Sequence, residues 1–142
     1  MAAAASIMRA EQIVLKAMDT ALHPFDLTWA RYEALVLLSF TRTGTLPMGK
    51  MGQRLMIHPT SVTNIINRLE DDGLVERVAH PEDRRTRLAR ITKAGRELAA
   101  KASVAVDDVR FGVGSLDAAK QEALIDLIRD FRLSVQDFLP EV

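Results

Sequence analysis

One amphipathic stretch, HPTSVTNIINRLEDDGL at residues 58–74, constrains the fold more than any other part of the chain. Its apolar residues recur at the spacing of one helical face, and they are Val62, Ile65, Ile66 and Leu69. Pro59 suits the first turn of a helix, and Gly73 suits the left-handed position that ends one. The sequence therefore predicts a helix that begins at Pro59, ends before Gly73 and buries one side.

The opposite face of this helix is unusual, because Thr, Ser and Asn are poor helix formers. Asn pairs well with adenine edges in the DNA major groove, and Ser and Thr contact phosphates or bases. The alternative is a plain surface helix, for which Glu and Lys are the expected residues. We expect the face to bind DNA through Pro59, Thr60, Ser61, Thr63, Asn64, Asn67 and Arg68.

Three more helices are predicted before and beside this one. Apolar residues from Ile7 to Leu22 predict a first helix, which the turn at residues 23–26 ends. Thr28 suits the cap of a second helix that ends at Gly44 and is apolar on most sides, so it should be buried. A short helix within residues 46–57 then pairs with the helix at Pro59 as a helix-turn-helix candidate.

After Gly73, residues 74–80 and 85–91 predict two short strands around the loop PEDRR. Six basic residues and no acidic one lie between Arg84 and Arg96. Arginines at a hairpin tip can enter a narrow minor groove, and we expect Arg84, Arg85 and Arg87 to contact DNA. Asp83 is expected to hold the guanidinium of Arg85 in place. The alternative is a solvated loop whose charges only keep the protein in solution.

Two helices are predicted at the C-terminal end. Thr92 suits the cap of the first, which runs to about Phe111, and Ser115 suits the cap of the second. The last helix carries one long apolar stripe, made of Leu124, Leu127, Ile128, Phe131, Val135 and Phe138. We expect part of the stripe to pack on its own chain, but it is longer than one small subunit can cover. An isologous dimer would bury the remainder.

Composition excludes several classes of function. The chain has 142 residues, enough for a single domain, and no cysteine, which excludes disulfides and thiol-based redox sensing. Its start has no secretory signal, and no apolar run approaches the roughly 20 residues that cross a bilayer. We therefore expect a cytoplasmic protein with no membrane contact. Residues 47–96 carry ten basic and six acidic groups, whereas residues 97–142 carry five and nine. A basic middle indicates one face for a polyanion.

At DRRTRLARIT the chain resembles the MarR family of transcription regulators, which are winged helix-turn-helix dimers. The family's wing motif is matched by Asp83, Arg85, Ile91 and Thr92, with Ile where the family has Leu. Residues 60–77 resemble the family's recognition helix and following strand, although Met51-Gly52 stands where a Leu-Ala step is usual. The resemblance implies a fold that is mainly α with a small β-hairpin wing. It has a winged helix-turn-helix lobe at residues 28–96, and residues 1–27 and 97–142 form mainly dimerisation helices.

The same resemblance implies further site residues. Its first, fifth and sixth helices intertwine across a two-fold axis, which adds Ile7 and Val14 to the expected dimer interface. It also implies a small aromatic or phenolic effector bound between the dimer helices and the lobe. Candidates for that site are Arg9, His23, Trp29 and Tyr32. The alternative is that Trp29 and Tyr32 belong to the core and that His23 caps a turn.

Catalysis is not indicated. No zinc-protease motif, phosphate-binding glycine loop or nucleophile elbow is present, so we expect neither an enzyme nor a cofactor. A zinc site from His23, His58 and His80 is conceivable, but their spacing does not call for one. We expect a sequence-specific regulator that binds double-stranded DNA, a ligand-responsive repressor acting as a homodimer on a pseudo-palindromic operator. The alternative is a winged-helix module for protein interaction or dimerisation without specific DNA binding.

Overall fold

The computed structural model describes residues 1–83 and 85–136 of the chain. The predicted contacts of Arg84 and Phe138 therefore lie outside the described residues. The elements, in chain order, are α1 (Ala2–Leu22), η1 (His23–Phe25), α2 (Trp29–Phe40), β1 (Thr45–Pro47), α3 (Met48–Leu55), α4 (Pro59–Asp71), β2 (Val75–Ala79), β3 (Arg87–Ile91), α5 (Lys93–Asp108), η2 (Arg110–Gly112) and α6 (Ala118–Ser134). The expected fold, mainly helical with a small β-hairpin wing, is confirmed.

The wing belongs to a sheet of three strands in the order β1-β3-β2, with every pair antiparallel. In the hairpin, Val75 pairs with Ile91 and Ala79 pairs with Arg87. Strand β1 was not predicted, and it adds Leu46 opposite Ala89 at the edge of β3. The sheet therefore ties the start of α3 to the base of the wing.

Side-chain caps mark where α2, α5 and α6 begin. Thr28 accepts a hydrogen bond from the backbone N–H of Arg31 at 3.4 Å, and Thr92 accepts one from Gly95 at 3.0 Å. Both caps agree with the sequence. The predicted cap of the last helix was wrong: Asp117, not Ser115, accepts from the backbone N–H of Lys120, at 2.9 Å. An ionised carboxylate at this position also favours the positive end of the helix dipole.

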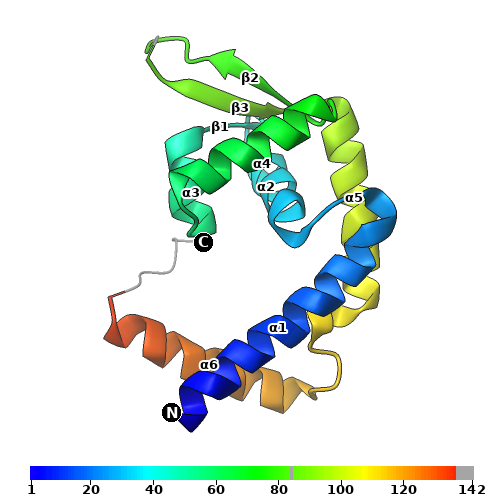
Figure 1. Cartoon of the computed structure of the whole chain (residues 1–142), viewed down its shortest axis with the longest axis vertical. Coiled ribbons are helices and arrows are strands. Elements are labelled where there is room, and N and C mark those ends of the chain that lie inside the picture. The colour runs from blue at the N-terminus through cyan, green and yellow to red at the C-terminus, as the bar shows by residue number, and fades with distance from the viewer. Residues whose placement is uncertain (84, 137–142) are drawn as a thin grey trace.

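Helix α4 packs by its apolar side onto α2, which is central as expected (Figure 1). Val62, Ile66 and Leu69 are buried, and Ile65 is half-buried against the same cluster. On α2, Ala34, Leu35 and Leu38 belong to the same core cluster and are fully buried. This core fixes which side of α4 is left for solvent.

Gly52 has a structural reason in α3, where Met51-Gly52 stands in place of the usual Leu-Ala step. It is buried, and a Cβ added there would lie 3.3 Å from the side chain of Val62 and 3.2 Å from the carbonyl oxygen of Ile57. The absence of a side chain therefore lets α3 approach α4 closely, at the cost of helix propensity.

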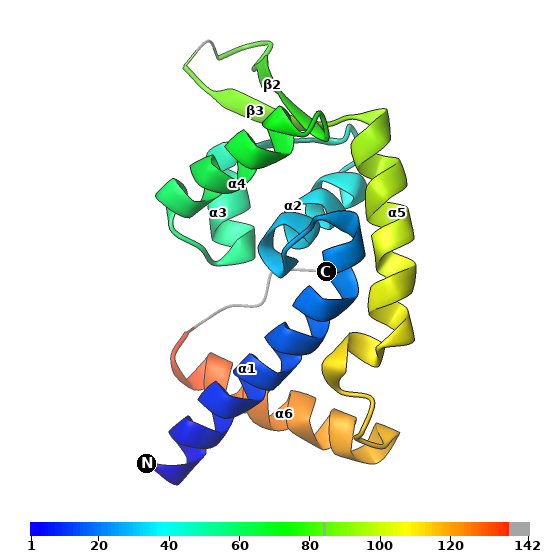
Figure 2. The same ribbon diagram turned by 45° about the vertical axis from the view of Figure 1, so that its right-hand side comes forward.

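Helices α1, α5 and α6 extend away from this lobe, and α6 crosses α1 in both views (Figures 1 and 2). Helix α5 ends at Asp108 rather than near Phe111, because Arg110 and Phe111 adopt left-handed backbone angles before Gly112. The turn after α5 rests on α1: a Cβ added at Gly112 would lie 3.2 Å from the Cα of Val14. No helix formed by the described residues is long and apolar enough to span a membrane.

The end of α4, the sheet and the start of α5 meet at Leu74. The N–H of Leu74 donates to the carbonyl of Leu69 at 2.8 Å, and its carbonyl accepts from the N–H of Thr92 at 3.0 Å. The hydroxyl of Thr92 donates to the carbonyl of Gly73 at 2.8 Å. Gly95 comes so close that a Cβ there would lie 2.2 Å from the carbonyl oxygen of Leu74.

We therefore expect Gly95→Ala to lower the free energy of unfolding by about 1–3 kcal/mol, because backbone must shift to accept the methyl group. Gly49→Ala is the matched control, since nothing lies within 4 Å of a Cβ at that helical position. It should raise the free energy of unfolding by up to about 1 kcal/mol. Urea unfolding at one protein concentration measures both, and equal midpoints would contradict the close approach at Leu74.

Candidate nucleic-acid interface

The polar side of α4 faces solvent along its whole length. All seven residues predicted to contact DNA on this helix are exposed: Pro59, Thr60, Ser61, Thr63, Asn64, Asn67 and Arg68. The buried side is Val62, Ile66 and Leu69, so the two faces divide as the pattern indicated. Exposure makes the face available, whereas the contacts themselves stay a prediction.

The N-terminus of α4 is capped by His58, whose Nδ1 accepts from the N–H of Thr60 at 3.2 Å. Thr63 donates its hydroxyl to the carbonyl of Pro59 at 3.2 Å, and its oxygen keeps acceptor capacity outward. The N–H groups of Ser61 and Val62 donate to the carbonyl of His58 at 2.9 and 3.2 Å. The first turn of α4 is therefore satisfied by His58, and what it presents to solvent is short polar side chains.

Arg68 lies at the other end of the face and is held by carboxylates. Its guanidinium is 3.2 Å from Asp72 and 3.5 Å from Asp26, and Asp72 also lies 3.8 Å from Arg31. Asp26 sits in the turn between α1 and α2. The ion pairs direct the Arg68 side chain toward that turn. Carboxylates of the protein therefore neutralise part of its positive charge, although the guanidinium stays exposed to a ligand.

A second guanidinium holds the middle of the face from the wing side. Arg77 of β2 donates to a carboxylate oxygen of Glu70 and to the side-chain oxygen of Asn67, and its backbone N–H donates to Glu70 at 3.2 Å. Sequence reasoning missed Arg77 and Glu70. The alternation of side chains along β2 indicates that Arg77 points inward, because it lies on the same face of the strand as the buried Val75.

The wing turn is organised by Asp83, though not in the predicted way. Its carboxylate accepts from the backbone N–H of Arg85 at 2.9 Å and from the hydroxyl of Thr86 at 2.6 Å. Among the described residues no ion pair joins Asp83 to the guanidinium of Arg85, so that expectation was wrong. A carboxylate two residues before the N–H closes a local turn more readily than it reaches a long side chain.

Further contacts shape the tip and leave arginines free. Nδ1 of His80 accepts from the N–H groups of Glu82 at 3.2 Å and Asp83 at 3.1 Å. Arg85 and Arg87 are exposed, Arg87 at the first position of β3. Among the described residues of the wing, the side chains of Arg85 and Arg87 have no ion-pair partner, so their positive charge is open to solvent.

The Thr86 hydroxyl, followed by the Arg85 N–H, holds the pKa of the Asp83 carboxyl below its usual range. A lowered pKa means that the ionised form is the one the folded wing favours. The contribution of the ionised Asp83 carboxyl to the stability of the fold is therefore present near neutral pH and is lost as the pH falls through the lowered pKa.

The four candidate ligand residues are not brought together. Trp29 and Tyr32 contact each other with ring centroids 5.5 Å apart, and the buried Tyr32 shares a hydrogen bond with Ser103 at 2.9 Å. His23 instead lines an open hollow of about 660 Å³ along α1. Arg9 is exposed and bonds to Gln12 at 3.3 Å.

Nearby, burial raises the pKa of the Glu33 carboxyl on α2. Among the described residues, no group of three His, Cys, Asp or Glu side chains is placed to hold a metal ion.

The candidate dimer residues are mostly uncovered. None of the residues of α6, all of which the structure describes, is buried. Leu127 is 68% exposed and Phe131 is 56% exposed, and Leu124, Val135 and Ile7 are also open to solvent. Ile128 is half-buried and lines a hollow along α6 with Leu124. Val14 differs, because it is half-buried on its own chain's core.

Comparison with known proteins gives a consistent result. The model of the MarR family matches residues 27–86. The structure of Sco5413, a MarR family transcriptional regulator from Streptomyces coelicolor, is 46% identical with a TM-score of 0.90, over 97% of this chain and 96% of that one. Sco3205, another MarR family regulator from that organism and solved in complex with DNA, is 26% identical with a TM-score of 0.83, over 92% and 84%.

A curated relative is also similar in sequence. The uncharacterised HTH-type transcriptional regulator YhbI of Bacillus subtilis is 34% identical over 89 residues, 63% of this chain. The match spans 56% of that relative's length, so a large part of the relative lies outside the similarity.

We expect Thr86→Val to raise the pKa of Asp83, because the hydroxyl is the largest cause of its depression. A carboxyl-carbon NMR titration measures the change. Asp117 is the internal control: Lys120 lowers its pKa at the start of α6, and this pKa should not move. An Asp83 titration midpoint that stays in place would contradict the wing geometry.

Proposed function

This chain belongs to the MarR family, and on that premise we propose that it is a transcription regulator that binds double-stranded DNA sequence-specifically as a homodimer. The observation that carries the proposal is the exposed Thr, Ser and Asn face of α4 beside the basic wing. Figure 1 shows helix α4 next to the β2–β3 hairpin that forms the wing. In the proposed division, residues 28–96 bind DNA, and residues 1–27 and 97–142 join the subunits.

In this proposal α4 enters the major groove and the wing reaches the neighbouring backbone or minor groove. The buried face of α4 makes the helix rigid with the lobe, so its polar side chains reach base edges in a fixed register. Arg85 and Arg87 supply charge for phosphates and for the negative potential of a narrow minor groove. Phosphate contacts place the protein, and base contacts select the site.

The proposal extends to how DNA binding is regulated. The chain acts in the cytoplasm as a repressor rather than as an enzyme, released from its operator by a small aromatic or phenolic ligand. Because Tyr32 is buried and bonded to Ser103, the hollow beside His23 suits such a ligand better than the Trp29–Tyr32 pair. With no cysteine in the chain, release cannot use a thiol.

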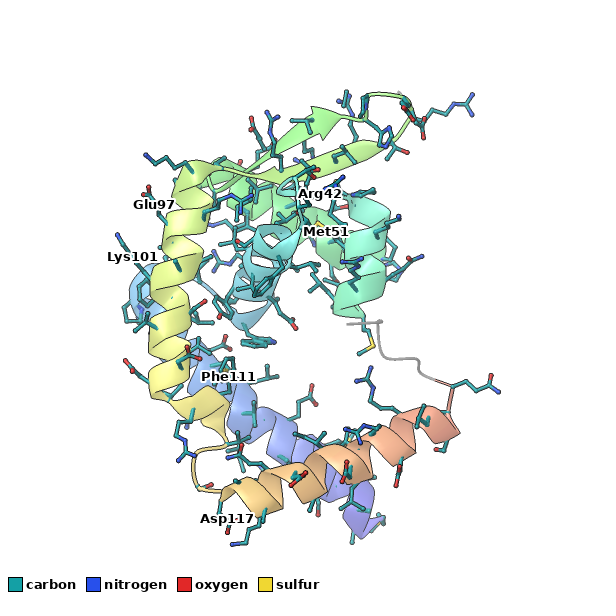
Figure 3. The ribbon with its side chains drawn as sticks, turned by 180° about the vertical axis from the view of Figure 1, so that it is seen from behind. Arg42, Met51, Glu97, Lys101, Phe111 and Asp117 are labelled. Atoms are coloured by element: carbon teal, nitrogen blue, oxygen red, sulfur yellow. The ribbon has the colours of Figure 1, made fainter. Side chains whose placement is uncertain are left out.

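Gel shifts at several salt concentrations test the proposal, using the gene's own upstream region and a random duplex. Specific binding should fall steeply with salt, and Arg85→Ala should flatten the log–log slope by about 1–2 per dimer, because one phosphate contact per subunit is lost. Lys101→Ala removes the same charge from α5, where Figure 3 shows Lys101 projecting away from the lobe, and it should leave the slope unchanged.

Equal affinity for the two duplexes would instead indicate a winged-helix interaction module. An Arg85→Ala slope equal to that of the wild type would remove the wing from the interface.

We expect Phe131→Glu to produce a monomer that has lost tight DNA binding, although every residue of the DNA face is intact. An unpaired charge buried in a two-fold interface costs several kcal/mol, on the order of 2–7 for a polar group alone. Light scattering measures the mass. Ala119→Glu, about 120° around α6 from Phe131 and outside the apolar stripe, is the control and should stay dimeric. A monomeric wild type would contradict the proposed assembly.

A further inference from the structure

Arg77 of β2 contacts the polar face of α4 without belonging to it. It lies in the middle of β2, directly opposite Ala89 of β3, and its side chain is 25% exposed. Glu70 of α4 holds it twice, once by its backbone N–H and once by its guanidinium. A side chain fixed at both ends loses little further freedom when it makes another bond. The guanidinium is therefore a preorganised donor toward α4.

That third bond goes to Asn67, on the exposed face of α4. A guanidinium has donors and no acceptor. The atom of the Asn67 amide that faces Arg77 must therefore be the oxygen, and the amide NH₂ is turned away from it. Asn67 consequently offers N–H donors outward, while its oxygen is engaged by the protein.

Asn64, one turn earlier on the same face, is different. It is exposed, and no other described residue donates to or accepts from its side chain. Its amide can rotate to place donor and acceptor in either order. This freedom is what pairing with adenine requires, since adenine shows an acceptor and a donor side by side in the major groove.

We propose that Arg77 is a positioning residue that sets base specificity: by holding the oxygen of Asn67, it makes Asn67 a donor-only reader. Such a reader selects a base with acceptors in the major groove, guanine above all, and rejects cytosine, which presents a donor there. Asn64 remains the residue suited to adenine. This inference rests on the proposed function, because it requires α4 to lie in the major groove.

The contact also stabilises the junction of α4 and the wing, so affinity alone cannot separate the two roles. Base identity can. A purely structural role for Arg77 predicts weaker binding with the same preferred sequence. A positioning role predicts a different preferred base at the pair of symmetric operator positions that Asn67 meets.

The experiment selects bound duplexes from a random pool with the full-length protein and with three variants. Asn67→Asp keeps an oxygen for Arg77 but turns an acceptor outward, and it should change the preferred base from guanine to cytosine by roughly tenfold. Arg77→Met frees the amide, and adenine should become as acceptable as guanine. Arg90→Met is the matched control, because Arg90 pairs with Glu76 at 2.7 Å in the same sheet but not with α4.

Thermal unfolding confirms that each variant is folded before selection. The inference is overturned if the wild-type pool shows cytosine at the position that Asn67→Asp alters, or if neither Asn67→Asp nor Arg77→Met changes the base there. It is also overturned if Arg90→Met alters the same position to the same extent. A wild-type pool with no enriched sequence is a different result, because it contradicts the proposed function itself.

Discussion

The backbone at Gly73 and Leu74 is the constraint on which the rest of the structure depends. Helix α4 ends just before them, strand β2 begins just after them, and Thr92 and Gly95 bring the start of α5 against the same carbonyl groups. These contacts are made by backbone atoms and by the short side chain of Thr92. The start of α5 is thereby linked directly to the end of α4. In the proposed function, the dimer helices set the distance between the two subunits, and this junction sets where α4 lies relative to α5. The distance between the two recognition helices therefore depends on the junction.

The two halves of the chain are stabilised differently. Helix α4 is held by a core within its own chain, through α2, whereas α6 leaves its apolar side chains uncovered. A face such as that of Leu127 and Phe131 is costly to leave in water, because each large apolar side chain is worth about 1.5–3 kcal/mol when buried. The core of the chain also includes Met18 of α1 and Val106 of α5, so among the helices outside residues 28–96 it is α6 whose apolar side chains lack cover. This division fits a regulator in which DNA reading is built into each subunit and assembly places two of them together.

The sequence predicted those features that follow from local rules. The period of Val62, Ile66 and Leu69 fixed both faces of α4, and Thr28 and Thr92 marked helix starts by the chemistry of a hydroxyl cap. Predictions failed where two options were locally equal or where contacts were tertiary. Asp117 replaced Ser115 as a cap two residues away, and β1 has too few residues to show a period. The bond from Arg77 to Asn67 depends on the packing of a strand on a helix, which no local pattern describes.

In the proposed assembly two copies of α4, held by a two-fold dimer, read one operator together. Hydroxyl-radical footprinting of a selected operator tests it most directly, because it maps protected sugars on each strand at single-nucleotide resolution. We predict two symmetric protected regions on one face of the duplex, with centres about one helical turn, roughly 10 bp, apart. A single protected half-site, or protection without two-fold symmetry, would contradict the claim.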